Sequence, residues 1–90
     1  MKANTSNVLG DIVRFHRRRG GLSQHELADL ARIGKTSVFD IEKGKPTVRL
    51  ATLMAVLGVL NIDLMLDGPL MDECRAALGD PTEPDTDTGP

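Results

Sequence analysis

The first part of the chain carries apolar residues at the spacing of a short helix. Leu9, Ile12, Val13 and His16 recur every three or four positions, which predicts a helix with these four side chains on its buried face. The run RRRGG that follows places cations, and then glycine, where a helix commonly ends. We therefore expect the first helix to stop there and His16 to be a partly buried packing residue.

Two further short helices are predicted within GLSQHELADLARIGKTSVFDIEKGK, residues 21–45. Ser23 and Glu26 have the spacing of a capping box, in which each side chain accepts a hydrogen bond from the other residue's free backbone N–H. After a tight turn, Val38 and Ile41 form the buried pair of the next helix. Two such helices in close succession are typical of a helix-turn-helix. Its second helix enters the major groove of DNA while the first lies across the backbone.

A long apolar stretch and then a change of period follow. Residues 50–60, LATLMAVLGVL, predict a fourth helix packed on at least two others, in which Gly58 would allow close packing. Ile62, Leu64 and Leu66 then recur at every second position, which predicts a strand. The sequence offers no second strand. The same strand of another copy, paired antiparallel about a two-fold axis, would satisfy its backbone groups; a short fifth helix is the alternative.

Charge is distributed unevenly along the chain. The net charge is −2, yet residues 1–49 hold ten Lys and Arg against five Asp and Glu, whereas residues 50–90 hold one against eight. A basic half fits a surface that meets phosphate. The acidic, proline-containing end from residue 79 is expected to be a disordered tail, and residues 70–78 could form a short helix before it.

The chain has none of the residue groupings that enzymes or metal sites require. His16, His25 and the single Cys74 are scattered, and there is no glycine-rich phosphate loop. We therefore expect no enzymatic activity, no metal and no cofactor. No apolar run is long enough for a signal peptide or a membrane span, and a lone thiol fits a reducing compartment, so we expect a cytoplasmic protein without a membrane partner.

The pattern LSQHELADLARIGKTSVFDIEKGK resembles the Cro/Xre-type helix-turn-helix of bacterial and phage repressors. The later stretch NIDLMLDG is similar to that of HipB-like antitoxins, small repressors that pair with a HipA-type kinase toxin. Two positions depart from the family: Arg32 stands where Gly is usual, and Gly34 stands where Ser or Thr usually caps the reading helix. The residues that carry the resemblance are Gly10, Leu22, Ser23, Gln24, Glu26, Leu27, Ala28, Val38, Ile41, Glu42 and Gly44.

The resemblance implies an all-α fold, a lambda-repressor-like helix-turn-helix bundle of four to five helices with a short C-terminal strand that pairs across a homodimer. The expected function is that of a sequence-specific repressor that binds a palindromic DNA operator, represses its own operon and binds a HipA-type kinase toxin. The alternatives are a stand-alone Xre-type repressor of phage or restriction–modification type, and a protein-interaction module without DNA binding. The expected organisation is an arm (1–7), a DNA-binding and dimerisation domain (8–69), a possible short helix (70–78) and an acidic tail (79–90).

A set of mostly polar residues would contact DNA from the two central helices and the loop that follows. Gln24 would donate to a phosphate at the start of the first of these helices. Phe39 would meet a thymine methyl group, unless it folds back onto the domain, and Asp40 would accept from cytosine, unless it pairs with Lys43 or Arg32. The complete expected set is Gln24, Gly34, Lys35, Thr36, Ser37, Phe39, Asp40, Lys43, Lys45 and Arg49.

Glu42 interrupts the basic run and is expected to have a structural task. In the repressors that this sequence resembles, the matching Glu pairs with an Arg of the first helix, here Arg17. The residues expected to carry dimerisation are Ile62, Leu64 and Leu66.

Overall fold

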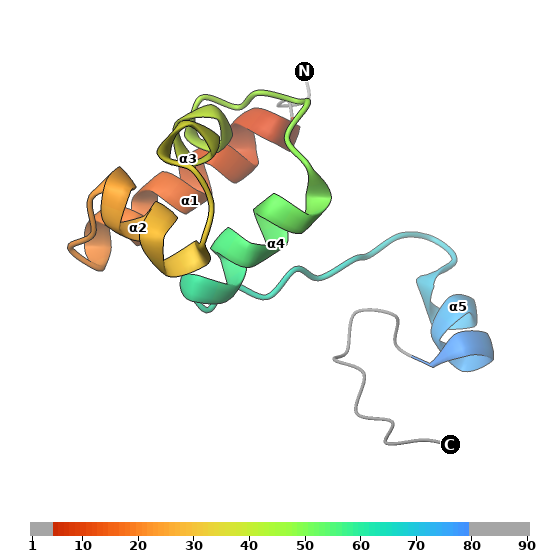
Figure 1. Cartoon of the computed structure of the whole chain (residues 1–90). Helices are drawn as coiled ribbons and strands as arrows, with labels where there is room; N and C mark the ends of the chain where they lie inside the picture. Colours follow the sequence, from red (N-terminus) through yellow and green to blue (C-terminus); the bar gives the residue numbers. More distant parts are fainter. Residues whose placement is uncertain (1–4, 80–90) are drawn as a thin grey trace.

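A computed structural model describes residues 5–79 of the chain. The first four helices form a bundle, and the fifth lies apart from them at the end of an extended segment (Figure 1). The helices are α1 (Thr5–Arg19), α2 (Gln24–Ala31), α3 (Lys35–Glu42), α4 (Leu50–Val59) and α5 (Met71–Leu78). The predicted all-α fold is thus confirmed, and α1 includes residues 5–7, which the sequence assigned to the arm. Residues 1–4 of that arm and residues 80–90 of the expected tail lie outside the described part.

Each of the four bundle helices contributes side chains to one hydrophobic core. Full burial of a Leu or Val side chain contributes about 1.5–3 kcal/mol, so this cluster is the main source of stability. Helix α4 packs against α2 and α3. It is apolar on all sides, and Leu50 and Met54 on its outer side stay exposed. The core residues are Val13, Leu27, Ala28, Val38, Ile41, Leu53, Val56 and Leu57.

The buried face of α1 differs from the one predicted. Val13 is buried together with Gly10 and Arg17, and Leu9 is half-buried against the core, whereas Ile12 is 37% exposed and His16 is exposed. The ring Nδ1 of His16 lies 2.7 Å from the carbonyl oxygen of Ile12, one turn earlier in the helix. The expectation of a packing histidine is therefore wrong, because α1 presents a glycine and a charged side chain to the bundle instead.

Gly10 lets the backbones of α1 and α3 approach each other closely. A Cβ atom at this position would lie 2.8 Å from the carbonyl oxygen of Glu42 and still nearer to that of Ile41. Only hydrogen fits there. The opposite holds for Gly58, which is exposed: apart from its chain neighbours and the backbone of its own helix, no described atom would lie within 4 Å of an added Cβ. The prediction that Gly58 permits close packing is therefore wrong for the single chain.

All four bundle helices end in the same way, with a Schellman motif. In each, a residue in the left-handed conformation follows the helix, and the next N–H donates back to a helix carbonyl at 2.9–3.1 Å. The apolar residue after the left-handed position packs on the core in three cases, namely Leu22, Ile33 and Ile62. The left-handed residues are Gly21, Arg32, Gly44 and Asn61.

The segment from residue 62 to 68 forms neither helix nor strand within the described chain. The alternative of a short helix over residues 62–66 is therefore wrong, and the predicted strand is not formed because a strand needs a hydrogen-bonded neighbour. Ile62 and Leu64 pack against the core of their own bundle. Leu66 is not among the residues that pack against the core, and its side chain is 50% exposed.

Candidate nucleic-acid interface

The turn between α2 and α3 contains both departures from the family pattern. Arg32 adopts the left-handed conformation (φ 59°, ψ 45°) that glycine would adopt more easily, at a cost of about 1 kcal/mol. Gly34 is the N-cap of α3 in an extended conformation and supplies no side-chain hydrogen bond. The tight turn is thus kept, although Arg32 is strained and the first backbone N–H groups of α3 receive no hydrogen bond from a side-chain cap.

The predicted capping box fixes where α2 begins. The backbone N–H of Ser23 donates to Glu26 Oε1 (2.8 Å), and the backbone N–H of Glu26 donates to Ser23 Oγ (3.0 Å). The hydrogen bond from the Ser23 backbone, together with that from its side chain, holds the pKa of Glu26 below its ordinary value. Helix α2 therefore starts at a defined residue, next to Gln24.

Helix α3 divides into a buried face and an outward face. Val38, Ile41 and Glu42 are buried, while Lys35 and Thr36 at its start are exposed. Ser37 is half-buried between the two faces. Apart from Phe39, the outward face is therefore polar, which suits a helix that reads a DNA groove.

Phe39 stands on the outward face of α3 and is not folded back onto the domain. It is 45% exposed, and the ammonium nitrogen of Lys43 lies 5.1 Å from the centre of its ring. This cation–π contact holds both side chains at the surface. An exposed aromatic ring beside a cation suits contact with a thymine methyl group next to a phosphate.

Asp40 pairs with a residue that the sequence did not indicate. Its carboxylate lies 3.7 Å from the Lys45 ammonium, so neither Lys43 nor Arg32 is its partner. Arg49 is exposed on the same loop after α3. These side chains border a hollow between α3 and the start of α4, lined by Ser37, Asp40, Lys45, Thr47, Val48, Arg49 and Thr52. Thr47 and Thr52 were not predicted as site residues, because only the folded loop brings them beside α3.

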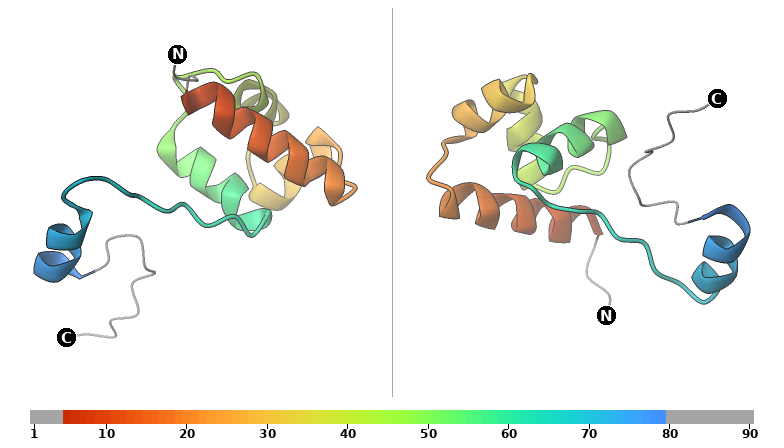
Figure 2. Two further views of the ribbon diagram at one scale, coloured as in Figure 1. Left: turned by 180° about the vertical axis from the view of Figure 1, so that it is seen from behind. Right: turned by 90° about the horizontal axis from the view of Figure 1, so that it is seen from below.

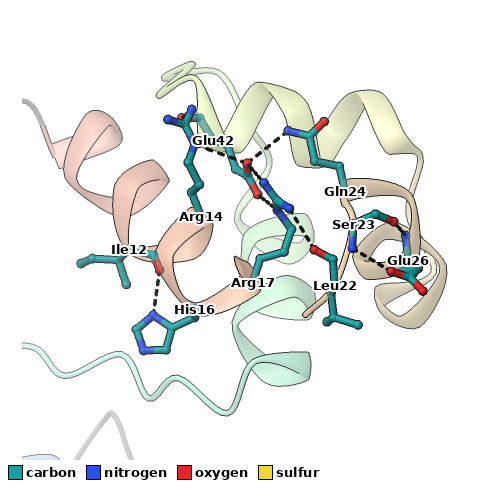
Figure 3. Close-up of polar contacts among 9 residues, drawn as sticks. All are labelled: Ile12, Arg14, His16, Arg17, Leu22, Ser23, Gln24, Glu26 and Glu42. Carbon is teal, nitrogen blue, oxygen red and sulfur yellow. Dashed lines mark hydrogen bonds and ion pairs between the residues drawn. The ribbon is translucent and has the colours of Figure 1, made fainter. Parts of the chain in front are cut away.

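Arg17 and Glu42 form a buried ion pair behind the outward face of α3 (Figure 3). Arg17 Nε donates to Glu42 Oε2 at 2.6 Å, and Arg17 Nη2 donates to Glu42 Oε1 at 3.0 Å. The remaining nitrogen, Nη1, donates to the carbonyl oxygen of Leu22 at 2.9 Å. This bidentate pair joins α1 to the last residue of α3 and to the turn before α2.

Two further side chains converge on Glu42 (Figure 3). Gln24 Nε2 donates to Oε1 at 3.1 Å, and Arg14 Nε lies 3.6 Å from the same oxygen. Burial raises the pKa of Glu42, but hydrogen bonds from Arg17 and Gln24, with the charges of Arg17 and Arg14, outweigh it and leave the pKa below its ordinary value. Gln24, expected to serve a phosphate, is thus engaged within the domain, and neither Gln24 nor Arg14 was predicted as a partner of Glu42.

The described residues offer no sign of a metal site or a membrane span. Residues 5–79 contain no group of three or more His, Cys, Asp or Glu side chains arranged to hold a metal ion. Over the same range, every helix is too short or too polar to cross a membrane.

Comparisons with known proteins agree with this geometry. Residues 13–66 match a family model described as helix-turn-helix. The chain is 37% identical over 69 residues to the HTH-type transcriptional regulator y4mF of Sinorhizobium fredii, covering 74% of this chain and 91% of that protein.

Solved structures show a similar fold. A chain of a HipA–HipB–O2–O3 complex superposes with a TM-score of 0.66 at 22% identity, covering 76% of this chain and 96% of that one. A HipB–O4 20mer complex gives the same score, identity and coverage. The clp gene regulator ClgR from Corynebacterium glutamicum gives a TM-score of 0.57 at 26% identity, covering 63% and 61% of the two chains.

Proposed function

This chain belongs to the Cro/Xre-type helix-turn-helix family of transcriptional regulators, and from that premise we propose that it is a homodimeric repressor of its own operon and the antitoxin of a HipA-type kinase toxin. The observation that carries the DNA-binding part is the outward face of α3. It combines exposed basic residues with an exposed aromatic ring, and the buried Arg17–Glu42 pair braces it from behind.

In the proposed complex, the start of α3 enters the major groove. Lys35 donates to guanine or to a phosphate, Thr36 and Ser37 donate to base edges or phosphates, and Phe39 covers a thymine methyl group. Lys43 lies against the Phe39 ring and faces the backbone. Asp40 accepts a hydrogen bond from a cytosine amino group once its ion pair with Lys45 is broken.

Helix starts supply the proposed phosphate contacts. The start of α3 has no side-chain cap, and no described atom lies within 4 Å of the place where a Gly34 Cβ would stand. A phosphate can therefore approach the free N–H groups there. Gln24, held in place by Glu42, retains a second amide hydrogen for a phosphate at the start of α2. Lys45 and Arg49 complete the contacts to the backbone.

The test of DNA binding is fluorescence anisotropy with a palindromic duplex from the chain's own promoter. Neutralising about four to six phosphates should give log K a slope of roughly −4 to −5 against log salt concentration. Lys35→Ala and Phe39→Ala should each weaken binding by about 1–3 kcal/mol and leave the oligomeric state unchanged. A scrambled duplex of equal composition is the control. Equal affinity for both duplexes, or no dependence on salt, would support a protein-interaction module instead.

We propose that two copies associate through residues 62–66, centred on Leu64, together with the uncovered outer side of α4. Two observations support this. Leu50 and Met54 leave an exposed apolar surface on α4, and the backbone after Ile62 is free of helix and strand bonding in the described chain. Antiparallel pairing would satisfy those backbone groups and bury Leu66.

The toxin partner is the finer part of the proposal. Its support is the fold shared with the HipB chain of a complex that contains HipA. Such a regulator works in the cytoplasm, where its operon is transcribed. Co-purification of the untagged neighbours after expression of the native operon is the test. Retention of a kinase-like protein would establish the antitoxin, whereas recovery of the homodimer alone would establish a stand-alone repressor.

A further inference from the structure

The outer side of α1 carries an aromatic and basic surface that DNA reading does not use. Phe15 is 60% exposed, and the Arg19 guanidinium lies 5.9 Å from the centre of its ring. Figure 2 shows α1 along the outside of the bundle. We call this surface the Phe15 patch; it is a shallow hollow lined by Asp11, Arg14, Phe15, Arg18 and Arg19.

The charges of the Phe15 patch are not balanced within the bundle. Arg14 and Arg17 turn toward Glu42, but across residues 5–79 neither Arg18 nor Arg19 forms an ion pair. Exposed aromatic rings beside arginines are typical of the centre of protein–protein interfaces. The Phe15 patch therefore has the composition of a docking surface for an acidic, partly apolar partner.

Helix α5 has the complementary composition. Leu70, Met71, Cys74 and Leu78 lie on one side of it by their spacing, and Leu78 is 78% exposed. Acidic residues Asp72 and Glu73 occupy its first turn. From residue 67 to the end, the sequence contains seven acidic residues and one basic residue.

Helix α5 is held away from its own bundle. It lies beyond the extended segment that follows α4 in all three views (Figures 1 and 2). Arg75 Nη2 donates to the carbonyl oxygen of Leu66 at 3.0 Å, which joins α5 to that segment. On the apolar side of α5, Leu70 and Leu78 are thus exposed, while Met71 and Cys74 are half-buried.

We infer that α5 of one copy docks on the Phe15 patch of a second copy, its apolar side against Phe15 and its acidic residues beside Arg18 and Arg19. The inference rests on the proposed dimer: antiparallel pairing about Leu64 sets Leu66 of one copy beside Ile62 of the other, so α5 leaves the pairing on the partner's side. Charge favours α1 over α4, because two arginines flank Phe15, whereas Leu50 and Met54 have only Arg49 nearby, which the proposed function assigns to the DNA backbone.

Paramagnetic relaxation in the full-length protein tests where α5 docks. A nitroxide is attached at Ala76→Cys in a Cys74→Ser background, on the side of α5 away from its apolar residues. This chain is mixed with a ¹⁵N-labelled Cys74→Ser chain that carries no nitroxide. Docking between copies predicts loss of amide signal from residues 11–19 of the labelled chain. Signal loss confined to α4, no loss on α1, or loss only when both labels share one chain would overturn the inference.

Charge reversal adds a test of specificity. Arg18→Glu combined with Arg19→Glu should abolish the signal loss on α1 and raise the dimer dissociation constant by about tenfold. Asp72→Lys with Glu73→Lys in the same chain should restore both. Phe15→Ala, at an exposed position, should weaken docking without lowering the thermal stability of the bundle. Failure of the reversed pair to restore docking would overturn the inference.

Two controls separate this inference from the proposed function. If sedimentation shows the unmodified chain to be a monomer, the proposed dimer fails and the docking of α5 fails with it. A dimer that binds operator but shows no signal loss on α1 refutes the docking alone. If reversal of Arg18 and Arg19 weakens operator binding while the signal loss on α1 persists, the Phe15 patch contacts DNA, and the inference is wrong.

Discussion

The buried carboxylate of Glu42 is the point at which polar side chains from several helices meet. It accepts hydrogen bonds from Arg17 and Gln24 and lies near Arg14, so donors from α1 and α2 meet at the end of α3. Burying a charge costs several kcal/mol unless it is paired and hydrogen-bonded on all sides. Here the requirement is met: among the described residues, no buried side-chain nitrogen or oxygen lacks a partner.

The lowered pKa of Glu42 predicts a loss of stability in acid. A carboxyl whose pKa is lower in the folded than in the unfolded state stabilises the fold at pH values above its ordinary pKa of 4.5. This contribution is lost as the pH falls through the folded-state pKa below that value. Thermal unfolding followed from neutral pH into this acid range should therefore show a steep fall in Tm.

Glu42→Gln is the matched variant, because it keeps the shape and removes the titration. It should be less stable than the unmodified chain at neutral pH, by about 1.5–3 kcal/mol, with a smaller further loss in acid. Parallel pH profiles for the two proteins would show that Glu42 is not the source of the acid sensitivity.

Arg32 predicts a gain in stability on substitution by glycine. It adopts φ 59°, where a side chain costs about 1 kcal/mol, so Arg32→Gly should raise the free energy of unfolding by about that amount and Tm by roughly 4–8 °C. Asn61→Gly is the matched control at φ 58°, and its gain should be smaller because Asn tolerates this conformation. Urea denaturation of both variants measures the difference. A larger gain at Asn61 would contradict this account.

At the scale of elements, the sequence predicted the helices and their ends better than their faces. The capping box at Ser23 and the buried pair of α3 follow from local spacing, which a short stretch of sequence contains in full. The inner face of α1 does not follow from it, because a search for apolar residues selects Ile12 and His16. Packing instead selects Gly10, for backbone approach, and Arg17, for a partner that lies 25 positions away.

The candidate site likewise contains features that local sequence spacing predicts and features that depend on tertiary packing. The outward positions of α3 could be named from the sequence, since Val38 and Ile41 define its buried side. The link from Gln24 to Glu42 could not, because it depends on how α2 and α3 cross. The pairing of Asp40 with Lys45 likewise depends on the path of the loop after α3.

Two glycines in helices predict opposite responses to the same substitution. Gly10→Ala would place a Cβ against the backbone of α3, and the resulting displacement should cost about 1–3 kcal/mol. Gly58→Ala meets no described atom and should stabilise α4 by about 0.8–1 kcal/mol through helix propensity. Chemical denaturation at low protein concentration measures both. A loss at Gly58 under these conditions would contradict this account, whereas a loss that appears only as the protein concentration is raised would show that another copy covers Gly58.

At the scale of the whole molecule, the chain separates a basic N-terminal half, which includes α3 and the loop after it, from an acidic C-terminal part. The basic residues after the start of α3 lie on the outward face and its loop, and α5 carries acidic residues at a distance from them (Figure 1). In the proposed complex, this separation would keep the acidic residues away from DNA phosphates and leave them available to a protein partner.

The proposed dimer predicts a monomer when residues 62–66 receive a charge. Leu64→Asp should split the dimer and weaken operator binding only through the loss of two-site attachment. Because Leu64 also packs on its own core, Leu66→Asp is the sharper variant: half of the Leu66 surface is already exposed. Sedimentation velocity measures the outcome. If both variants remained dimers, pairing through this segment would be ruled out.

The anchoring of Glu42 by two other helices has a consequence for operators. Helix α3 cannot shift along or rotate about its axis without breaking the hydrogen bonds that join Glu42 to both α1 and α2. In the proposed dimer, the two reading helices then meet DNA at one preset separation. A site with a base pair inserted at its centre has to be matched by overtwisting or bending of the duplex itself. When the spacing between the two half-sites is wrong, the deformation energy is therefore stored in the DNA. Affinity should then depend on the flexibility of the central base pairs, which the protein does not contact.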